Sequence, residues 1–284
     1  MTLLTPSRVR ALLDEHDLAP SRGLGQHFLA DPNTARRIVR LAGVAADDRV
    51  LEIGPGLGSL TLALLEAGGR VLALELDRHV VPALRAVVPV GSALDVVVGD
   101  ALAEDLDGLL AAREPGTARW KLVANLPYNV ATPLVVRVLE TAPRVDELLV
   151  MVQREVGERL AAPVGTAAYG AVTVKVGYYG EAAVVGIVPP SVFVPPPKVE
   201  SALVRVRRHR DPPVDVADPE RLFALVRAGF AHRRKMLRQA LRGLLGDRTV
   251  AVLEAAGIDP RARAETVTLD GWARLAGAVG EAGA

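Results

Sequence analysis

The sequence predicts an α/β fold built on one open sheet, followed by a small C-terminal all-α domain. The sheet is predicted by four apolar segments that end in polar residues or glycine at even intervals, with helix-forming segments between them. The small domain is predicted because, after the linker Asp211-Pro212-Pro213, the apolar residues recur only with helical spacing. We therefore expect a sheet domain over residues 1–210 and a helical domain over residues 211–284.

The four segments have the length and β-branched composition of buried strands. They are Val50–Ile53, Val71–Leu74, Val96–Val98 and Trp120–Ala124. The residues at their ends, Gly54, Glu75, Asp100 and Asn125, are separated by 21, 25 and 25 positions, the length of a strand plus a crossover helix. The helices predicted in the gaps are Ser59–Ala67, His79–Val88 and Leu102–Ala112. Right-handed crossovers make such strands parallel, so these end residues converge on the edge where open α/β sheets bind ligands.

The remaining elements are predicted from shorter patterns. Thr5-Pro6 has the form of a cap and first residue of an N-terminal helix. Further strands are expected at Leu148–Gln153, Val172–Tyr178 and Leu203–Val206, with a helix at Arg154–Leu160. The helices expected after the linker are Pro219–Phe230, Arg233–Leu245, Thr249–Ala256 and a last one from about Asp270.

The composition excludes several classes of protein. Half of the 284 residues are hydrophobic and 24% are charged, a normal globular mixture. The chain has no cysteine, so disulfides and thiolate metal sites are excluded. The five histidines are scattered without metal-ligand spacing, and we expect no metal. No apolar run is long enough to span a bilayer and no signal peptide is apparent, so we expect a cytoplasmic protein without a membrane partner. No dimer-forming stripe is evident, which favours a monomer.

A glycine-rich loop follows the first strand of the array, in Glu52-Ile53-Gly54-Pro55-Gly56-Leu57-Gly58. Glu75, 21 residues after Gly54, is placed to accept hydrogen bonds from a ribose diol. This combination serves nicotinamide dinucleotides and S-adenosylmethionine alike. The spacing G-x-G-x-G departs from the dinucleotide pattern, and a carboxylate at Glu52 suits an ammonium better than a pyrophosphate. Asp100, in Gly99-Asp100-Ala101, is placed to contact an adenine edge. Together with the spacing of the glycine loop, this favours S-adenosylmethionine over a nicotinamide dinucleotide as the ligand.

Asn125-Leu126-Pro127-Tyr128 stands directly after the strand Trp120–Ala124. The Asn125 oxygen and a backbone carbonyl can accept the two N–H groups of an exocyclic amine, and the Tyr128 ring offers a stacking surface for a flat base. The alternative is a plain turn, with Asn as a helix cap and Pro as the first helical residue. The position of the tetrapeptide beside the methyl-donor motifs favours an amine methylation site.

These motifs together closely resemble the ribosomal RNA adenine N6-dimethyltransferase family, and the bacterial small-subunit members in particular. The resemblance covers nearly the whole chain. Besides the motifs above it includes Gly25-Gln26-His27-Phe28-Leu29, Glu75-Leu76-Asp77, Phe193-Val194-Pro195-Pro196-Pro197-Lys198-Val199-Glu200-Ser201 and Arg233-Arg234-Lys235. It implies a Rossmann-like class I S-adenosylmethionine-dependent methyltransferase sheet, with S-adenosylmethionine as methyl donor and no metal.

The resemblance also implies roles for individual residues. His27, Leu29, Gly54, Glu75, Asp100 and Asn125 are implied to contact S-adenosylmethionine. The catalytic set is Asn125, Leu126, Pro127 and Tyr128, with Phe193 as candidate second aromatic wall. The family commonly has Asn or His at position 27, so His27 is not expected to be a catalytic base; a structural loop histidine is the alternative. The implied substrate is the N6 atom of two adjacent adenines, each dimethylated, in a loop near the 3′ end of 16S rRNA. The implied setting is ribosome biogenesis, with the immature small ribosomal subunit as partner.

A local excess of positive charge predicts a polyanion partner. Residues Arg205 to Arg248 contain 12 lysines or arginines against 5 acidic residues. On the expected helix Arg233–Leu245, Arg234, Arg238 and Arg242 recur every four residues as one basic stripe, opposite an apolar one. The alternative is an ordinary solvated face. The candidate RNA-binding residues are Lys198, Arg233, Arg234, Lys235, Arg238 and Arg242.

Three other functions remain open from the residues. A large-subunit 23S rRNA adenine methyltransferase conferring antibiotic resistance shares the catalytic motifs. A nicotinamide dehydrogenase shares the glycine loop but leaves Asn125–Tyr128 unexplained. A mainly non-catalytic assembly factor that binds immature small subunits is the third.

Overall fold

The fold is described from a computed structural model, which describes residues 1–21 and 23–281. The chain forms two compact units. The sheet unit contains Met1–Gly157 and Ala182–Arg208, and the helical unit contains Glu158–Glu181 and His209–Ala284. The crossing after Arg208 lies close to the boundary expected at residue 210. Glu158–Glu181, which the sequence analysis placed in the sheet domain, belongs to the helical unit.

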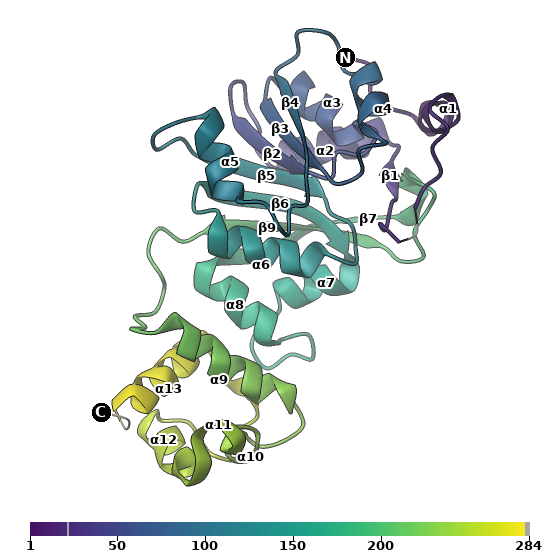
Figure 1. Cartoon of the computed structure of the whole chain (residues 1–284). Helices are drawn as coiled ribbons and strands as arrows, with labels where there is room; N and C mark the ends of the chain where they lie inside the picture. Colours follow the sequence, from purple (N-terminus) through teal and green to yellow (C-terminus); the bar gives the residue numbers. More distant parts are fainter. Residues whose placement is uncertain (22, 282–284) are drawn as a thin grey trace. The chain divides into compact units, whose positions relative to one another are not determined.

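The centre of the first unit is a seven-stranded sheet in the order β4-β3-β2-β5-β6-β9-β7 (Figure 1). The strands are β2 (Arg49–Ile53), β3 (Arg70–Glu75), β4 (Leu94–Val98), β5 (Trp120–Asn125), β6 (Val145–Gln153), β7 (Gly180–Val188) and β9 (Ser201–Arg208). Strands β4, β3, β2, β5 and β6 pair in parallel, and β9 is antiparallel to β6. The predicted α/β sheet is therefore confirmed.

Helices cover the sheet as crossover connections require. They are α2 (Pro32–Leu41), α3 (Ser59–Glu66), α4 (Val81–Val87), α5 (Leu106–Arg113), α6 (Ala131–Thr141) and α7 (Arg154–Leu160). α3 packs on α2 and β3, whereas α6 packs on α5 and β6, and Figure 1 shows the two groups on opposite faces of the sheet. The chain reverses its direction across the sheet between β2 and β5. Ligands of open α/β sheets bind at such a switch point.

A second, two-stranded sheet joins the N-terminal segment to a distant part of the chain. In it β1 (Phe28–Leu29) pairs antiparallel with β8 (Phe193–Val194), which follows the 3₁₀ turn Pro190–Val192. The segment before β1 includes α1 (Pro6–Glu15), whose first turn is capped by the Thr5 hydroxyl as the sequence predicts. The Ser59 hydroxyl at the start of α3 donates to the Leu29 carbonyl, so the small sheet is fastened beside the glycine loop.

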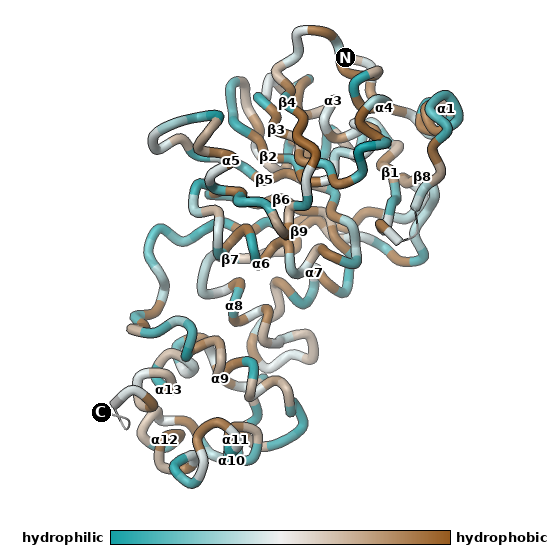
Figure 2. The backbone as a smooth tube through the Cα atoms, viewed as in Figure 1, coloured by the Kyte–Doolittle hydropathy of each residue, from teal (hydrophilic) through white to brown (hydrophobic). Residues whose placement is uncertain are grey.

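The core of the sheet unit is almost entirely aliphatic. Val50, Leu64, Ala73 and Val123 are fully buried in one cluster. Figure 2 shows the central strands chiefly in the hydrophobic colour, with hydrophilic residues in the connecting loops. Strands buried on both faces carry such near-continuous apolar runs. Within the described residues, no helix has both the length and the apolar character needed to cross a bilayer.

One predicted strand is wrong. Val172–Tyr178 was expected to be a strand because its valines alternate, but the segment forms the helix α8 (Ala171–Tyr179). Its buried residues include Val174 and Tyr178, which are one helical turn apart and pack in the core of the helical unit. This packing outweighs the strand preference of the β-branched residues. The strand of this region is β7, which the sequence analysis did not predict.

The helical unit is built around Trp272, which is fully buried. Its helices are α8, α9 (Pro219–Ala231), α10 (Leu237–Ala240), α11 (Arg242–Leu245), α12 (Thr249–Ala255) and α13 (Leu269–Glu281), with 3₁₀ turns at Gly246–Arg248 and Ala264–Thr266. α9 packs against α8, α10 and α13. The Asp218 carboxylate accepts a hydrogen bond from the Arg221 N–H at 3.0 Å and caps α9.

The continuous helix expected over Arg233–Leu245 is also wrong. α9 ends at Ala231, a turn follows, and α10 and α11 are short separate helices. The Leu237 N–H donates to the Ala262 carbonyl at 2.8 Å and the Arg238 N–H to the Pro260 carbonyl at 3.1 Å. A neighbouring segment thus satisfies N–H groups that a longer helix would have bonded internally. The basic stripe of arginines every four residues consequently does not exist.

Candidate active site at the sheet switch point

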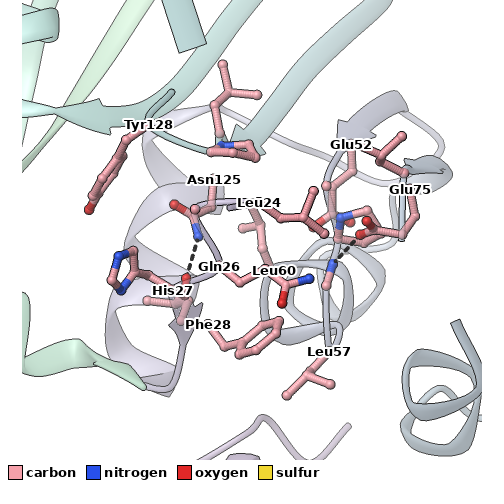
Figure 3. A pocket seen from close by; sticks show the side chains of 18 of the residues that line it. Leu24, Gln26, His27, Phe28, Glu52, Leu57, Leu60, Glu75, Asn125 and Tyr128 are labelled. Atoms are coloured by element: carbon pink, nitrogen blue, oxygen red, sulfur yellow. Dashed lines mark hydrogen bonds between the residues drawn. The ribbon is translucent and has the colours of Figure 1, made fainter. Parts of the chain in front are cut away.

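A pocket opens at the carboxyl ends of β2, β3 and β5, at the switch point of the sheet. We call it the switch-point pocket (Figure 3). It is lined by the segments 24–29, 54–57 and 125–130 and by five further residues, Glu52, Ser59, Leu60, Glu75 and Leu76. Four strands and loops that are far apart in the sequence therefore supply one cavity. Of the predicted site residues, His27, Leu29, Gly54, Glu75 and Asn125–Tyr128 all line it.

The glycine loop takes a conformation that requires glycine. Gly54, Gly56 and Gly58 have φ angles of 69°, 54° and 92°, in the left-handed region that side chains disfavour. A Cβ on Gly56 would lie 3.0 Å from the Phe28 ring, which is closer than normal contact. The loop therefore brings bare backbone to the wall of the pocket.

Glu75 connects this loop to the end of β3. Its Oε2 accepts the Gly56 N–H at 3.0 Å and its Oε1 accepts the Asp77 N–H at 2.9 Å. Burial raises the pKa of the Glu75 carboxyl, and the two N–H donors oppose that shift. A carboxylate held in this way has oxygen lone pairs left to accept hydrogen bonds from ribose hydroxyls.

Glu52 is the second carboxyl of the pocket and lies on β2, on the same side as Glu75 (Figure 3). It is only 1% exposed, and its Oε2 accepts a hydrogen bond from the Thr61 hydroxyl at 2.7 Å. Burial raises the pKa of Glu52 to about 8, against which the Thr61 hydrogen bond acts. Among the residues that the structure describes, no lysine or arginine lines the pocket, and none forms an ion pair with this carboxyl. Such a site suits the ammonium group of a ligand.

Asn125 ends β5 with its amide in a fixed orientation. Its Nδ2 donates to the His27 backbone carbonyl at 3.2 Å. The amide oxygen is then the free acceptor, and Figure 3 shows it directed to the side where Tyr128 lies. An oxygen in this position can accept an N–H from an exocyclic amine. The interpretation of Asn125 as a simple helix cap does not hold, because α6 begins only at Ala131 and Asn125 makes no capping bond to it.

Tyr128 presents its ring beside this oxygen. The phenol and the fully buried Ser201 hydroxyl share a hydrogen bond of 2.7 Å. The ring stacks on the His27 imidazole, with centroids 5.6 Å apart and planes at 28°. The His27 Nδ1 in turn lies 2.8 Å from the Pro195 carbonyl. His27 is therefore a packing and orienting residue, consistent with the expectation that it is not a base.

A second cavity adjoins the first and shares Gln26, His27 and Tyr128 with it. We call it the proline-lined cavity, because its other walls are Pro20, Gln153 and the segment Pro195–Val199. Lys198 lines this cavity, and none of its lining residues in the described part of the chain is acidic. The switch-point pocket thus contains the carboxyl groups and the neighbouring cavity contains the cation. This division fits a cationic ligand in the first and an anionic one in the second.

Two predicted site residues lie elsewhere. Asp100 is exposed, accepts the Leu102 N–H at 2.9 Å and is not among the lining residues of the pocket. Phe193 is only 3% exposed and pairs with Leu29 inside the hydrophobic core. It lines neither cavity, so its geometry does not support a second aromatic wall. The aromatic groups that border the proline-lined cavity are His27 and Tyr128.

The basic residues predicted to bind RNA differ in their surroundings. The Arg233 guanidinium donates to Glu265 at 2.8 Å and to the Thr166 carbonyl at 3.1 Å, so it links parts of the helical unit. Arg242 lies 3.7 Å from Asp247 on an exposed surface. Arg234, Lys235 and Arg238 are exposed, with no ion pair found among the described residues. Of the apolar residues expected opposite them, Met236 and Leu244 are also exposed.

Gln26 is the most informative residue that the sequence analysis did not assign. Its Nε2 donates to the Asp77 carboxylate at 3.0 Å, and its Oε1 accepts the Ser21 N–H at 2.8 Å. The N-terminal loop is thereby bonded to the turn after β3, across the pocket. Gln26 stands beside His27 in the Gly25–Leu29 motif. Its partner Asp77 is 51 residues away in the sequence, so the residues around Gln26 give no indication of this hydrogen bond.

Comparison with known proteins is consistent with this geometry. Residues 20–279 match the family described as Ribosomal RNA adenine dimethylase. The chain belongs to this family. It is 46% identical to the Ribosomal RNA small subunit methyltransferase A of Cutibacterium acnes, over 99% of this chain and 96% of the relative. It is also 46% identical to the protein of that name from Magnetococcus marinus, over 95% of each chain.

Solved structures show the same family fold. The chain is similar to the 23S rRNA methyltransferase ErmE, with a TM-score of 0.67 and 29% identity, over 89% of this chain and 99% of that one. It is similar to a dimethyladenosine transferase from Plasmodium falciparum, with a TM-score of 0.72 and 25% identity, over 88% of this chain and 96% of that one. The family assignment made from the motifs is therefore confirmed.

Proposed function

We propose that this protein transfers methyl groups from S-adenosylmethionine to the N6 atom of adenines in 16S rRNA. The observation that carries the proposal is the amide of Asn125. Its nitrogen is bonded to the His27 carbonyl and its oxygen is free beside the Tyr128 ring, at the edge of a pocket that contains two carboxyls. Because the chain belongs to the ribosomal RNA adenine dimethylase family, we infer that the amine bound by Asn125 is that of an adenine in ribosomal RNA.

The residues of the switch-point pocket fit the methyl donor. The carboxylate of Glu75 is oriented by two backbone N–H groups and would accept hydrogen bonds from the ribose. The buried Glu52 carboxyl suits the ammonium of the methionine moiety, because no lysine or arginine of the described residues lines the pocket. Leu29 and Gly54 would supply apolar surface and bare backbone. When bound, S-adenosylmethionine supplies an electrophilic methyl group on its sulfonium.

Asn125 and Tyr128 orient the adenine amine that receives the methyl group. The lone pair of the adenine amine is delocalised into the ring, so the amine is a weak nucleophile. Accepting its N–H groups on the Asn125 oxygen and the Leu126 carbonyl draws the lone pair toward the methyl group. Stacking on Tyr128 fixes the base and is worth about 1–3 kcal/mol. Alignment of amine and methyl group then supplies most of the rate.

No general base is required before the attack. The nitrogen becomes cationic and acidic once it is methylated, and the proton then leaves to solvent. His27 is bonded to Pro195 and stacked on Tyr128, so it is placed to orient and not to abstract. A neutral amide at Asn125 tolerates an amine that has lost one N–H, which is compatible with two successive transfers to each adenine.

The cavity next to Tyr128 and the exposed basic residues suit a nucleic acid as the methyl acceptor. The proline-lined cavity carries Lys198 and no carboxylate, and base chemistry requires the adenine to be unstacked. The exposed Arg234, Lys235 and Arg238 of the helical unit are the candidates for phosphate contacts. We place the substrate in the immature small ribosomal subunit, the enzyme in the cytoplasm and its functional form as a monomer.

The competing functions differ in their support. The likeness to the 23S rRNA methyltransferase ErmE is at 29% identity, whereas relatives named small subunit methyltransferase A reach 46%. The small-subunit function is therefore favoured. The dehydrogenase offers no role for Asn125. An assembly factor acting without catalysis would not need an oriented amine acceptor, although binding and catalysis can coexist in one protein.

Methyl transfer to defined RNAs tests the proposal. The protein is incubated with labelled S-adenosylmethionine and either immature small subunits or large-subunit RNA, and the labelled adenines are mapped. We expect dimethyladenine in the small subunit alone. Labelling of the large-subunit RNA would establish the resistance activity instead. Binding of small subunits without any transfer would establish the assembly function.

A further inference from the structure

The strand beside β5 ends in a second carboxamide, that of Gln153 on β6. Residues that pair across a sheet lie on the same face of it, and so do alternate residues of one strand. Asn125 on β5 pairs with Met151 on β6, and Gln153 stands two positions after Met151. Asn125 and Gln153 therefore lie on the same face of the sheet, at the ends of adjacent strands.

The next strand, β9, continues this row of polar residues (Figure 1). Its first residue, Ser201, pairs directly with Gln153, and the buried Ser201 hydroxyl shares the 2.7 Å hydrogen bond with the Tyr128 phenol. Deeper on the same face, Met151 and Leu203 belong to one buried apolar cluster. Gln153 thus stands where the core ends, next to the residue that holds the Tyr128 ring, and it lines the proline-lined cavity with that ring.

The Gln153 amide has hydrogen bonds left to give to a ligand. Other polar side chains of the cavity wall are engaged: the Gln26 amide is bonded at both ends, and the His27 Nδ1 and the Tyr128 hydroxyl have partners. Gln153 is half-buried, and no hydrogen bond of its side chain is found within the described part of the chain. Lys198, also at this cavity, is a point charge that suits a phosphate. A neutral amide with two N–H donors suits the edge of a base.

We propose that Gln153 recognises the target base, its amide donating an N–H to a ring nitrogen that flanks the amine of adenine, N1 or N7. The inference rests on the proposed function and adds a residue that recognises the base to those that bind its amine. Adenine has an unprotonated ring nitrogen on each side of the amine, and glutamine commonly pairs with this edge. The Asn125 oxygen and the Leu126 carbonyl accept the amine hydrogens, so a ring nitrogen is the acceptor left for Gln153.

This bond fixes the rotation of the base within its own plane. Stacking on Tyr128 sets the plane but allows the base to turn in it. The two hydrogen bonds to the amine meet at one nitrogen and act as a pivot, whereas a bond to a ring nitrogen lies off that pivot. Gln153 therefore holds the amine lone pair on the line of attack. The ring nitrogen is unchanged by the first methyl transfer, so the same contact serves the second.

The experiment measures kcat/KM for RNA in which 1-deazaadenine or 7-deazaadenine replaces the adenines mapped by labelling. Each analogue keeps the amine and exchanges one ring nitrogen for C–H. With the unaltered protein, we expect one of the analogues to lower kcat/KM by about 2- to 12-fold, the effect of one hydrogen bond. With Gln153→Ala, kcat/KM for adenine should fall by a similar factor, and the penalty for that analogue should disappear. The same penalty in both proteins would overturn the inference, as would full activity of Gln153→Ala on adenine.

Control variants separate recognition of the base from the shape of the cavity. Val199→Ala alters the wall of the same cavity without removing a hydrogen-bond donor, and it should keep the analogue penalty. Gln153→Glu keeps the side-chain length but replaces the amide donor by a carboxylate, so it should be no more active on adenine than Gln153→Ala. Gln153→Glu with the activity of the unaltered protein would refute donation from the amide. If Gln153→Ala does not fold, Gln153→Glu takes its place in the comparison of analogues.

Binding of the methyl donor gives an independent readout. Gln153 is not among the residues that line the switch-point pocket, so the calorimetric affinity for S-adenosylmethionine should be unchanged in Gln153→Ala. A loss of donor affinity would refute a role confined to the base.

The outcome is separable from that of the proposed function. Transfer to small-subunit adenines, with the same analogue penalty in both proteins, would retain the function and reject the role of Gln153. Transfer to large-subunit adenines, with a penalty that disappears in Gln153→Ala, would reject the small-subunit substrate and retain the role of Gln153.

Discussion

The side-chain amide of Asn125 donates to the backbone carbonyl of His27 at 3.2 Å, across 98 residues of sequence. This bond settles which end of the amide is left for a substrate. Were the amide reversed, its oxygen would oppose the His27 carbonyl and its NH₂ group would face the amine.

Asn125→Ala removes the amine acceptor without altering the carboxyls of the pocket. We expect kcat to fall by about 100- to 1,000-fold, the effect of deleting one oriented hydrogen-bonding group at a reacting centre. Donor binding, followed by calorimetry, should remain detectable. Turnover near that of the unaltered protein would remove Asn125 from the reaction.

Tyr128→Ala and Tyr128→Phe separate the ring from the hydroxyl. The alanine variant should lose the stacking of about 1–3 kcal/mol, equivalent to a loss of roughly 5- to 150-fold in kcat/KM. The phenylalanine variant should keep most of the activity. It leaves the buried Ser201 hydroxyl without its partner, so its Tm should fall in a thermal melt. Equal loss of activity in both variants would instead assign the effect to the phenol.

Gly56→Ala tests the approach of bare backbone to the pocket. The added Cβ would lie 3.0 Å from the Phe28 ring at a φ of 54°, and we expect donor affinity to fall by more than about tenfold. Gly91→Ala is the matched control, because its φ of 82° imposes similar backbone strain while nothing lies within 4 Å of the new Cβ. The control should lose stability, by about 1–2 kcal/mol, and bind the donor normally.

Arg233→Ala and Arg238→Glu should have different consequences. Arg233 is bonded to Glu265 and to the Thr166 carbonyl, so its loss should lower the Tm. Arg238 is exposed, and its reversal should weaken RNA binding and reduce the slope of log K against log salt by about 1 or more. Affinities measured over a salt series check this. An unchanged affinity of Arg238→Glu at low salt would exclude Arg238 from the RNA contact.

The stability of the ligand-free protein should decrease as the pH is raised from about 5 to 8. Burial raises the pKa of Glu52 to about 8 in the folded protein, from the ordinary glutamate value of 4.5, so the folded state binds more protons than the unfolded state within that interval. Stability therefore falls as pH rises through it and levels off above 8. Glu52→Gln should abolish this component. Denaturant melts of both proteins at several pH values measure it, and parallel pH profiles would contradict the assignment.

Most of the sheet was predictable because its signals are local. The residues Gly54, Glu75 and Asn125 stand at strand ends whose spacing follows from the length of a crossover unit. The helices that begin at Pro6 and Pro219 were predicted from a capping residue before a proline, and in the structure Thr5 and Asp218 make those caps.

The failures share a physical cause, which is competition from distant parts of the chain. The valines at 172–176 alternate like a strand, but the core of the helical unit selects a helix there. The expected helix at 233–245 is broken because Leu237 and Arg238 bond to carbonyls more than twenty residues later. The contact of Gln26 with Asp77 and the burial of Phe193 likewise depend on tertiary pairing, for which a single sequence has no marker.

The pairing of Phe28–Leu29 with Phe193–Val194 has a consequence for the order in which the site can form during synthesis. A nascent chain that has reached residue 153 contains the five strands β2 to β6, which pair in parallel, together with the glycine loop and Asn125. It still lacks the strand that orders the N-terminal wall of the pocket. The methyl-donor site therefore becomes complete only after residue 194 is available, when the proline-rich segment that borders the acceptor cavity is emerging as well. The pocket for the methyl donor and the cavity for the RNA base are therefore completed at the same stage of synthesis.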